Sequence, residues 1–255
     1  MIPKIIHICW LSGDEFPNNI KVCVESWKRV LPDYEIRIWD TKRFNIDSLL
    51  WTRQAFDVKK YAFAADYIRL YALYTEGGIY LDSDVMVFKS FDDLLDLPYF
   101  IGEDNVHCFE PAIIGAEKGC LWIKDILERY EDLPFVNTDG SYNMRSLPKV
   151  FHDKLTSKYK FYKVESISDF KRKEDVINVF PREWFNSRDF VASKQYAQAY
   201  CSHQFAGTWL KPTNKVKRLC KSLLPRKVLN FIYLLRYQIL DKNVIKKNQI
   251  PYLKQ

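Results

Sequence analysis

The segment of residues 61–88, YAFAADYIRLYALYTEGGIYLDSDVMVF, constrains the fold more than any other stretch. Apolar and aromatic residues repeat at helical spacing up to Glu76, which predicts an amphipathic helix. Two glycines then end the helix, since glycine adopts the positive φ angles of a sharp turn. A short apolar run follows and leads to Asp82 and Asp84. If the backbone is extended there, both carboxylates point the same way, because side chains alternate along a strand.

The order of the remaining patterns predicts an α/β fold with a mostly parallel, Rossmann-like sheet. Residues 4–10 are apolar at nearly every position, which is typical of a parallel strand buried on both faces. Ligands of such doubly wound folds bind beyond the carboxyl ends of the strands. The other predicted strands are 34–39, 99–102, 111–115, 159–164 and 176–180, and the other predicted helices are 17–31, 47–60, 120–130 and 147–155.

The chain has neither GxGxxG nor GxxxxGK[ST], the glycine-rich loops that bind phosphates in many such folds. A divalent cation held by Asp82 and Asp84 would meet the charge of a diphosphate instead. His203, in the motif HQFAGTW, is a candidate third ligand, because neutral imidazole suits a transition-type cation. Paired acids are also common in solvated turns, and a lone histidine is more often a core or surface residue. The buried strand before the acids favours the metal site.

Several other polar residues have a simpler structural interpretation. Asp66 and Arg69 are three apart on the predicted helix, where a surface salt bridge contributes only a few tenths of a kcal/mol. Asp139 lies in a polar turn and is a candidate to face the site. The loop carrying Glu103, Asp104, His107 and Glu110 is predicted to consist of solvated residues rather than substrate contacts.

Charge divides the chain into two predicted units. The net charge is +7, yet residues 211–255 contain twelve Lys or Arg and one acid, so the rest is mildly acidic. We predict a catalytic domain at 1–212 and a basic amphipathic helical extension at 213–255. Basic helices with apolar stripes suit an anionic membrane surface, and packing on the body with a solvated basic face is the alternative. No nucleic-acid partner is predicted, because the aromatic residues lie on the apolar stripe.

The six cysteines contain no CxxC-type pair, so buried free thiols in a reducing compartment are expected. No signal peptide is predicted, since Met1 leads directly into a strand, and no apolar run approaches the ~20 residues of a membrane span. We therefore expect a cytoplasmic protein, in peripheral contact with the inner membrane face.

Four motifs together resemble those of the DXD-containing glycosyltransferases of family 32. They are IPKIIHICW, SWKRVLPDYEIRIWD, AADYIRLYALYTEGGIYLDSDV and HQFAGTW. This family includes transferases of bacterial capsules and lipopolysaccharides and the yeast initiating mannosyltransferase. The central block is also similar to the catalytic core of the large clostridial glucosylating toxins. The resemblance is good over residues 2–100.

The resemblance implies a GT-A fold and retaining transfer of a sugar from a nucleotide sugar with Mn²⁺ or Mg²⁺. It implies that Asp82 and Asp84 hold the metal, with His203 as the ligand from the C-terminal part. It also implies that Asp66 and Arg69 hold donor sugar hydroxyls and act with the two acids in catalysis. The remaining donor-binding residues that it implies are Trp10, as an aromatic stacked on the base, Tyr80, Ser83, Gly207 and Trp209.

The chain departs from the family pattern at two places. Thr138-Asp139-Gly140-Ser141 replaces a common Thr-Gly-Pro, and Ala65-Asp66 replaces a common Ser-Asp. A retaining enzyme works by front-face attack or through a covalent intermediate. Asp139 and Glu110 are the candidate nucleophiles, and the sequence favours neither.

The predicted function is metal-dependent transfer of a sugar, with a UDP-sugar as favoured donor, to a glycan or glycolipid acceptor in bacterial surface polysaccharide biosynthesis. A GDP-mannose-dependent mannosyltransferase is the alternative among enzymes. A noncatalytic protein that binds sugar nucleotides or glycans is the alternative from another class.

Overall fold

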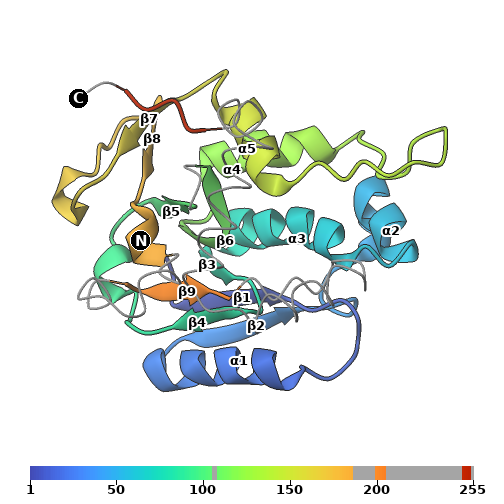
Figure 1. Ribbon diagram of the computed structural model, residues 1–255, viewed down its shortest axis with the longest axis horizontal. Helices are drawn as coiled ribbons and strands as arrows, with labels where there is room; N and C mark the ends of the chain where they lie inside the picture. The colour runs from blue at the N-terminus through green and yellow to red at the C-terminus, as the bar shows by residue number, and fades with distance from the viewer. Residues whose placement is uncertain (105–107, 186–198, 205–248, 254–255) are drawn as a thin grey trace, which may run out of the picture.

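The computed structural model describes residues 1–104, 108–185, 199–204 and 249–253, which form three layers around a central sheet (Figure 1). This sheet has five strands in the order β2-β1-β3-β6-β5. Its strands are β1 (Ile5–Cys9), β2 (Glu35–Trp39), β3 (Gly78–Leu81), β5 (Tyr99–Glu103) and β6 (Phe109–Ala116).

Four of the five strands run in the same direction. β1 pairs in parallel with both β2 and β3, while β6 pairs antiparallel with β3 and with β5. The central position of β1 explains its unbroken apolar sequence, because both of its faces are covered. The predicted α/β fold with a mostly parallel sheet is confirmed.

Side chains of the sheet alternate between two apolar cores. Tyr80 and Ile114 belong to the core that contains residues of the helical layer, whereas Ile79 and Ile113 face the other core. The helical layer consists of α2 (Leu50–Asp57), α3 (Tyr61–Glu76), α4 (Leu121–Leu127) and α5 (Leu147–Leu155). The opposite layer consists of α1 (Asn18–Val30) and a ladder of two short strands, β4 (Val85–Val87) and β9 (Cys201–His203).

A smaller sheet lies at the edge of the molecule where the described chain ends (Figure 1). Its strands β7 (Lys160–Lys163) and β8 (Val176–Val179) are parallel, and α6 (Arg182–Phe185) follows. Residues 249–253 continue this sheet, because the Leu253 amide donates to the Phe161 carbonyl at 2.8 Å. Within the described ranges, four short 3-10 helices connect other elements, at Ile46–Ser48, Asp92–Leu94, Glu128–Tyr130 and Ile167–Asp169.

The two-glycine turn between α3 and β3 has the backbone that the sequence predicted. Gly77 and Gly78 have φ angles of 70° and 112°, and the Gly77 amide donates to Leu73 at the end of α3. A Cβ on Gly78 would lie 2.7 Å from the Ile5 carbonyl oxygen and 2.9 Å from Nε2 of His7. Neighbouring β1 therefore permits only glycine at this position.

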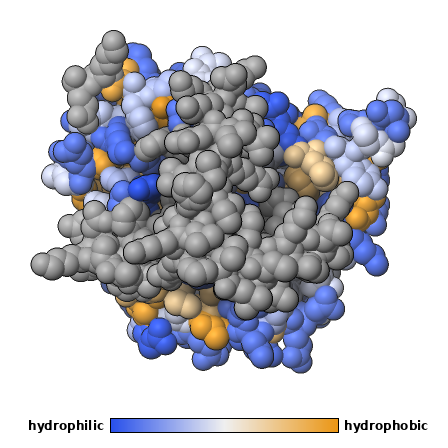
Figure 2. Space-filling model, in the orientation of Figure 1, coloured by the Kyte–Doolittle hydropathy of each residue, from blue (hydrophilic) through white to orange (hydrophobic). Residues whose placement is uncertain are grey.

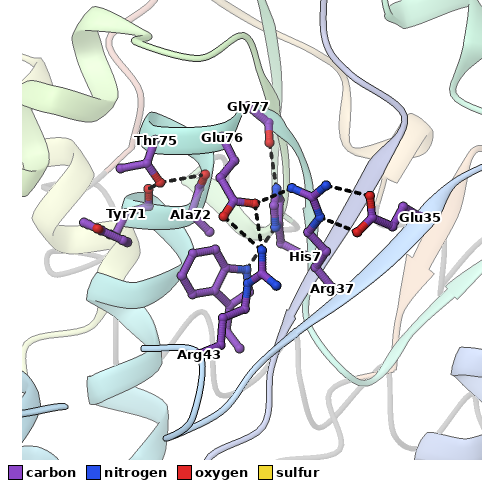
Figure 3. A network of polar contacts seen from close by, with 10 residues as sticks. His7, Glu35, Arg37, Arg43, Tyr71, Ala72, Thr75, Glu76 and Gly77 are labelled. Atoms are coloured by element: carbon purple, nitrogen blue, oxygen red, sulfur yellow. Dashed lines mark hydrogen bonds and ion pairs between the residues drawn. The ribbon is translucent and has the colours of Figure 1, made fainter. Parts of the chain in front are cut away.

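His7 fixes the same turn from β1 (Figure 3). Its Nδ1 accepts a hydrogen bond from Nε1 of Trp39 at 2.9 Å, so the ring proton is on Nε2, which lies 2.6 Å from the Gly77 carbonyl oxygen. The side chain is fully buried, and this desolvation lowers the pKa of His7. The neutral imidazole is thus part of the folded state.

Glu76, the last residue of α3, connects this turn to the edge of the sheet. Its carboxylate accepts from Arg37 of β2 at 2.6 Å and from Arg43 at 3.0 Å (Figure 3). Arg37 also binds Glu35 through two nitrogens. These contacts fix the direction in which the chain leaves α3 toward the two aspartates.

We expect the contribution of His7 to the free energy of unfolding to fall as the pH drops below about 6.5, the pKa of histidine in an unfolded chain. Below that pH, His7 of the unfolded chain binds a proton, whereas the buried His7 of the folded chain does not. The stabilising contribution of the neutral His7 therefore decreases as the pH falls from about 6.5 to the lowered pKa of the folded state. In chemical denaturation this contribution should approach a slope of about 1.4 kcal/mol per pH unit, measured as the difference between the parent and a variant that lacks His7. His7→Gln should remove much of it, whereas His152→Gln, at a less buried histidine, should change it less. An unchanged slope in His7→Gln would contradict the assignment.

The described cysteines are free thiols, as expected, namely Cys9, Cys23, Cys108, Cys120 and Cys201. Burial raises the pKa of Cys9 and of Cys120 to about 12, so both are protonated at neutral pH. Among the described residues no helix has the length and apolar character needed to cross a membrane. The described surface in Figure 2 is mostly hydrophilic, with isolated hydrophobic residues.

Candidate active site

The two aspartates lie in a turn, not in an extended strand as the sequence predicted. β3 ends at Leu81, and the Val85 amide donates back to the Asp82 carbonyl at 3.0 Å. The Asp82 amide donates to Ala112 of β6 at 2.8 Å, which fixes the start of the turn. Half-buried Ser83 lies between the acids. The carboxylates therefore converge because the chain bends, and not because strand side chains alternate.

The opposite layer holds β4 in place below this turn. Nε1 of Trp27, on the buried face of α1, donates to the Val85 carbonyl at 2.7 Å, and Oγ of Ser26 accepts from the Val87 amide at 3.0 Å. β9 pairs antiparallel with β4 so that His203 is opposite Val85. The Gln204 amide donates to the Asp84 carbonyl at 2.9 Å. The ladder thus brings His203 beside an aspartate 119 residues earlier in the sequence.

Asp82, Asp84 and His203 form a cluster in which one donor atom of each residue lies within 4.8 Å of the others. The Nε2 atom of His203 is 3.4 Å from Oδ1 of Asp84. Asp84 is buried, and Asp82 is partly accessible with 26% of its side chain exposed. Two carboxylates and an imidazole are a ligand set that suits Mn²⁺ or a similar cation, and an accessible side leaves space for further oxygen ligands. The residues present fit a divalent metal.

Arg69 is the buried centre of a second group beside the cluster. Its guanidinium lies 3.0 Å from Oδ1 of Asp66 and 3.2 Å from Oδ1 of Asp82, and it donates to the Pro111 carbonyl at 3.1 Å. It also lies over the ring of Tyr80, 4.6 Å from the centroid. Arg69 thereby links α3 to β3 and β6 at the edge where the aspartates lie.

A surface salt bridge between Asp66 and Arg69, the interpretation from spacing alone, is wrong. Their side chains are only 13% and 7% exposed. Desolvation raises the pKa of Asp66 to about 7, although the charge of Arg69 opposes the shift. Desolvation likewise raises the pKa of Asp82, against Arg69 and His203. Arg69 therefore offsets part of the cost of burying these two carboxylates.

Two aromatic residues complete this group. The Tyr80 hydroxyl lies 2.7 Å from Oδ1 of Asp82 and donates to it, which places a predicted donor-binding residue in the buried network. Tyr130 was not predicted, yet it is fully buried: burial raises the pKa of its hydroxyl, and the charge of Asp66 adds to this shift whereas that of Arg69 opposes it. Its position at the end of a predicted amphipathic helix indicated only a core residue, because Asp66 and Arg69 are distant from it in sequence.

Trp10 lies just after β1 and lines a groove of about 440 Å³. Its Nε1 donates to the Asp14 carbonyl at 2.6 Å, and its ring packs edge-on against Phe16 with 4.7 Å between centroids. The indole is thus held in a fixed orientation at a partly exposed position. The groove is lined by Trp10, Gly13, Asp14, Glu15, Phe16, Lys21, Ile38 and Asp40.

The prediction that Glu103 and Glu110 are solvated loop residues is wrong, because both are buried at strand ends. Glu103 accepts from Lys163 at 2.5 Å and from Tyr252 at 2.7 Å, away from the cluster. Glu110 lies beside the cluster, with Oε1 3.4 Å from Nδ1 of His203. Glu110 lies between Phe109 and Pro111, and Glu103 directly follows the run Tyr99-Phe100-Ile101-Gly102, so each acid adjoins a strand-like apolar pattern that signals burial.

Other predicted residues lie elsewhere or outside the described chain. Asp139 is exposed and accepts from the amide and hydroxyl of Ser141 in its own turn. His107, Gly207 and Trp209 are outside the described residues, as is the basic extension from 213 except for 249–253.

The charge on His203 depends strongly on its two acidic neighbours. Burial alone would lower its pKa, but Glu110 and Asp84 outweigh burial and raise the pKa to about 10. A cation between the aspartates would compete with this proton for Nε2.

Comparisons with known proteins point to one family. Residues 17–101 match the model described as "Glycosyltransferase sugar-binding region containing DXD motif". An inositol phosphoceramide mannosyltransferase of Schizosaccharomyces pombe is 32% identical over 122 residues, which cover 46% of this chain and 34% of that protein. An uncharacterized glycosyltransferase of Acanthamoeba polyphaga mimivirus is 26% identical, over 91% of this chain and 92% of that one.

Among solved structures, the PaToxG glycosyltransferase is similar with a TM-score of 0.46 and 21% identity, over 61% of this chain and 69% of that chain. The match to the fission-yeast enzyme spans about a third of that enzyme's length. The matched region of this chain contains both α3 and the turn with its two aspartates. Residues 17–101, a third of the chain, are therefore similar to the glycosyltransferase sugar-binding regions that contain the DXD motif.

Proposed function

We propose that the chain is a divalent-metal-dependent glycosyltransferase that moves a sugar from a nucleotide sugar to a glycan or glycolipid acceptor. The observation that carries the proposal is the convergence of Asp82, Asp84 and His203 from two distant segments, directly beside the buried Arg69. A sugar nucleotide needs one place for its diphosphate and another for its sugar. The cluster is the candidate site for the diphosphate, and the neighbouring group around Arg69 is the candidate site for the sugar.

The chain's own residues have distinct proposed roles. Asp82, Asp84 and His203 would hold Mn²⁺ or Mg²⁺, which when bound would neutralise the charge of the departing nucleoside diphosphate. Asp66 would accept from donor sugar hydroxyls, because Arg69 and the helix backbone fix its position. Trp10 would stack on the base in its groove.

A UDP-sugar and GDP-mannose remain the two proposed donors. The family resemblance favours the UDP-sugar and a retaining outcome. The printed name of the fission-yeast relative, a mannosyltransferase, favours a mannose donor. Front-face attack is the proposed course, because neither candidate nucleophile is placed for covalent catalysis: Asp139 is bound in its own turn, and Glu110 faces His203.

A panel of UDP- and GDP-sugars with Mn²⁺ tests the proposal, scored by donor hydrolysis and thermal shift. The true donor should be hydrolysed slowly and should raise the melting temperature by mass action, and chelation of the metal should abolish both effects. Binding without hydrolysis for every donor would favour the noncatalytic alternative. Hydrolysis unaffected by chelation would reject the metal site.

Contact of the basic extension with an anionic membrane is a further part of this proposal. Substituting Lys215, Lys217, Arg218 and Lys221 by glutamine should weaken binding to anionic vesicles by about 1 kcal/mol per charge, and leave donor hydrolysis unchanged. Substitution is preferable to truncation, because Tyr252 is hydrogen-bonded to buried Glu103. Equal vesicle binding by the variant and the parent would reject membrane contact. A role in bacterial surface polysaccharide biosynthesis rests on the family resemblance.

A further inference from the structure

The first three residues of β6 after Phe109 each contact a different part of the candidate active site. The Ala112 carbonyl accepts from the Asp82 amide at 2.8 Å, and the Pro111 carbonyl accepts from Arg69 at 3.1 Å. The preceding residue, Glu110, approaches His203 at 3.4 Å. The first two contacts use backbone atoms, so only Glu110 contributes to the site through its side chain.

The two ring nitrogens of His203 have different neighbours. Nε2 lies 3.4 Å from Asp84, within the cluster, and Nδ1 lies 3.4 Å from Oε1 of Glu110. Because these nitrogens point in different directions, a group bound at Nδ1 does not share a cation with Nε2. Among the described residues, the cluster of donor atoms within 4.8 Å contains both aspartates and His203 without Glu110.

Glu110 is itself held in place. It is 4% exposed, and its Oε1 accepts from the Ala112 amide at 3.2 Å. When a cation displaces the proton from Nε2, a buried carboxylate at a fixed position beside Nδ1 favours keeping the remaining proton on Nδ1. In the neutral imidazole, a proton on Nδ1 would lie beside Glu110 and leave the lone pair of Nε2 for a cation next to Asp84.

We propose that Glu110 is a positioning residue that orients His203 and holds it in the tautomer whose Nε2 binds the cation. The inference rests on the proposed metal-dependent function. Glu110 touches neither the cation nor the donor in this proposal, and acts only through the imidazole. Carboxylate partners of this kind raise the affinity of a histidine for metal by about 10–100-fold.

The test is Mn²⁺ binding to the full chain without donor, measured by titration calorimetry and by the electron paramagnetic resonance of free Mn²⁺. Glu110→Gln should raise the Mn²⁺ dissociation constant about 10–100-fold. Glu110→Asp, which keeps the charge but is one methylene shorter, should show a similar loss. The matched control is Glu103→Gln, at a carboxylate equally buried on the neighbouring strand and away from the cluster, and its affinity should remain that of the parent.

A second comparison separates positioning from a general effect of charge. In a His203→Ala background, Glu110→Gln should change the Mn²⁺ dissociation constant by less than about twofold, because the residue through which it acts is absent. The proposal would be overturned if Glu110→Gln still lowered the Mn²⁺ affinity about 10–100-fold in the His203→Ala background. It would also be overturned if Glu110→Asp bound Mn²⁺ with the affinity of the parent. A parent protein that binds no Mn²⁺ would overturn the metal-dependent function as well, whereas a binding parent with an unaffected Glu110→Gln would overturn this inference alone.

Discussion

Replacing Asp84 by asparagine is expected to lower metal-dependent donor hydrolysis by at least about 10²-fold, the effect of removing one electrostatic group from such a site. The substitution keeps the size of the side chain but removes a charge that lies 3.4 Å from His203. The cluster would then hold a single carboxylate. The stabilising effect of Mn²⁺ on thermal unfolding should disappear together with hydrolysis, because both depend on the same bound cation.

Asp125→Asn is the matched control for this variant. Asp125 lies on α4 and pairs with Lys158 and Tyr159, so the change removes an ion pair of similar type outside the candidate site. Its hydrolysis rate and its response to Mn²⁺ should equal those of the parent. If Asp84→Asn kept the parental rate at saturating Mn²⁺, the assignment of Asp84 as a metal ligand would be wrong.

Arg69→Met is expected to destabilise the fold by about 3–5 kcal/mol, the typical effect of removing one partner of a buried ion pair. Both Asp66 and Asp82 would lose their cationic neighbour. The loss should be smaller at about pH 6 than at about pH 8, because the pKa of Asp66, already about 7, would rise further and protonation would remove the unpaired charge. Chemical denaturation at the two pH values measures both effects.

Arg43→Met gives the comparison for an exposed arginine. Arg43 pairs with Glu76 and lies over the ring of Trp39, and 38% of its side chain is exposed. Its removal should change stability by less than about 1 kcal/mol, as for most surface ion pairs. A similar loss in both variants would indicate a general effect of arginine removal rather than the buried pairing of Arg69.

The sequence was sufficient for the sheet and for the location of the acids. Apolar runs and glycines are local signals, and β1, α3 and the two-glycine turn follow directly from them. The prediction that Asp82 and Asp84 follow a buried strand was correct. The prediction that their carboxylates converge because the backbone is extended was wrong. A turn after Leu81 depends on the hydrogen bond to Ala112, which no local pattern contains.

Burial of polar residues was the main feature that spacing did not predict. An i,i+3 pair such as Asp66 and Arg69 has the same sequence spacing on a helix face that is exposed to solvent and on one that packs against a sheet. Glu110 was assigned to a solvated loop because polar residues precede it, whereas its own neighbours are Phe109 and Pro111. Only the pairing of β6 with β3 and β5 shows that this carboxylate points into the molecule.

The short ladder of β4 and β9 has a consequence for the order of folding. All five strands of the central sheet lie within residues 5–116, so the sheet can form while the rest of the chain is still being synthesised. Pairing Val85 with His203 closes one of the longest loops among the described contacts, and contacts of high sequence separation form late. An incomplete nascent chain therefore holds both aspartates in a folded sheet but lacks the third member of the cluster. The candidate site becomes complete only after His203 has been synthesised and has paired with β4.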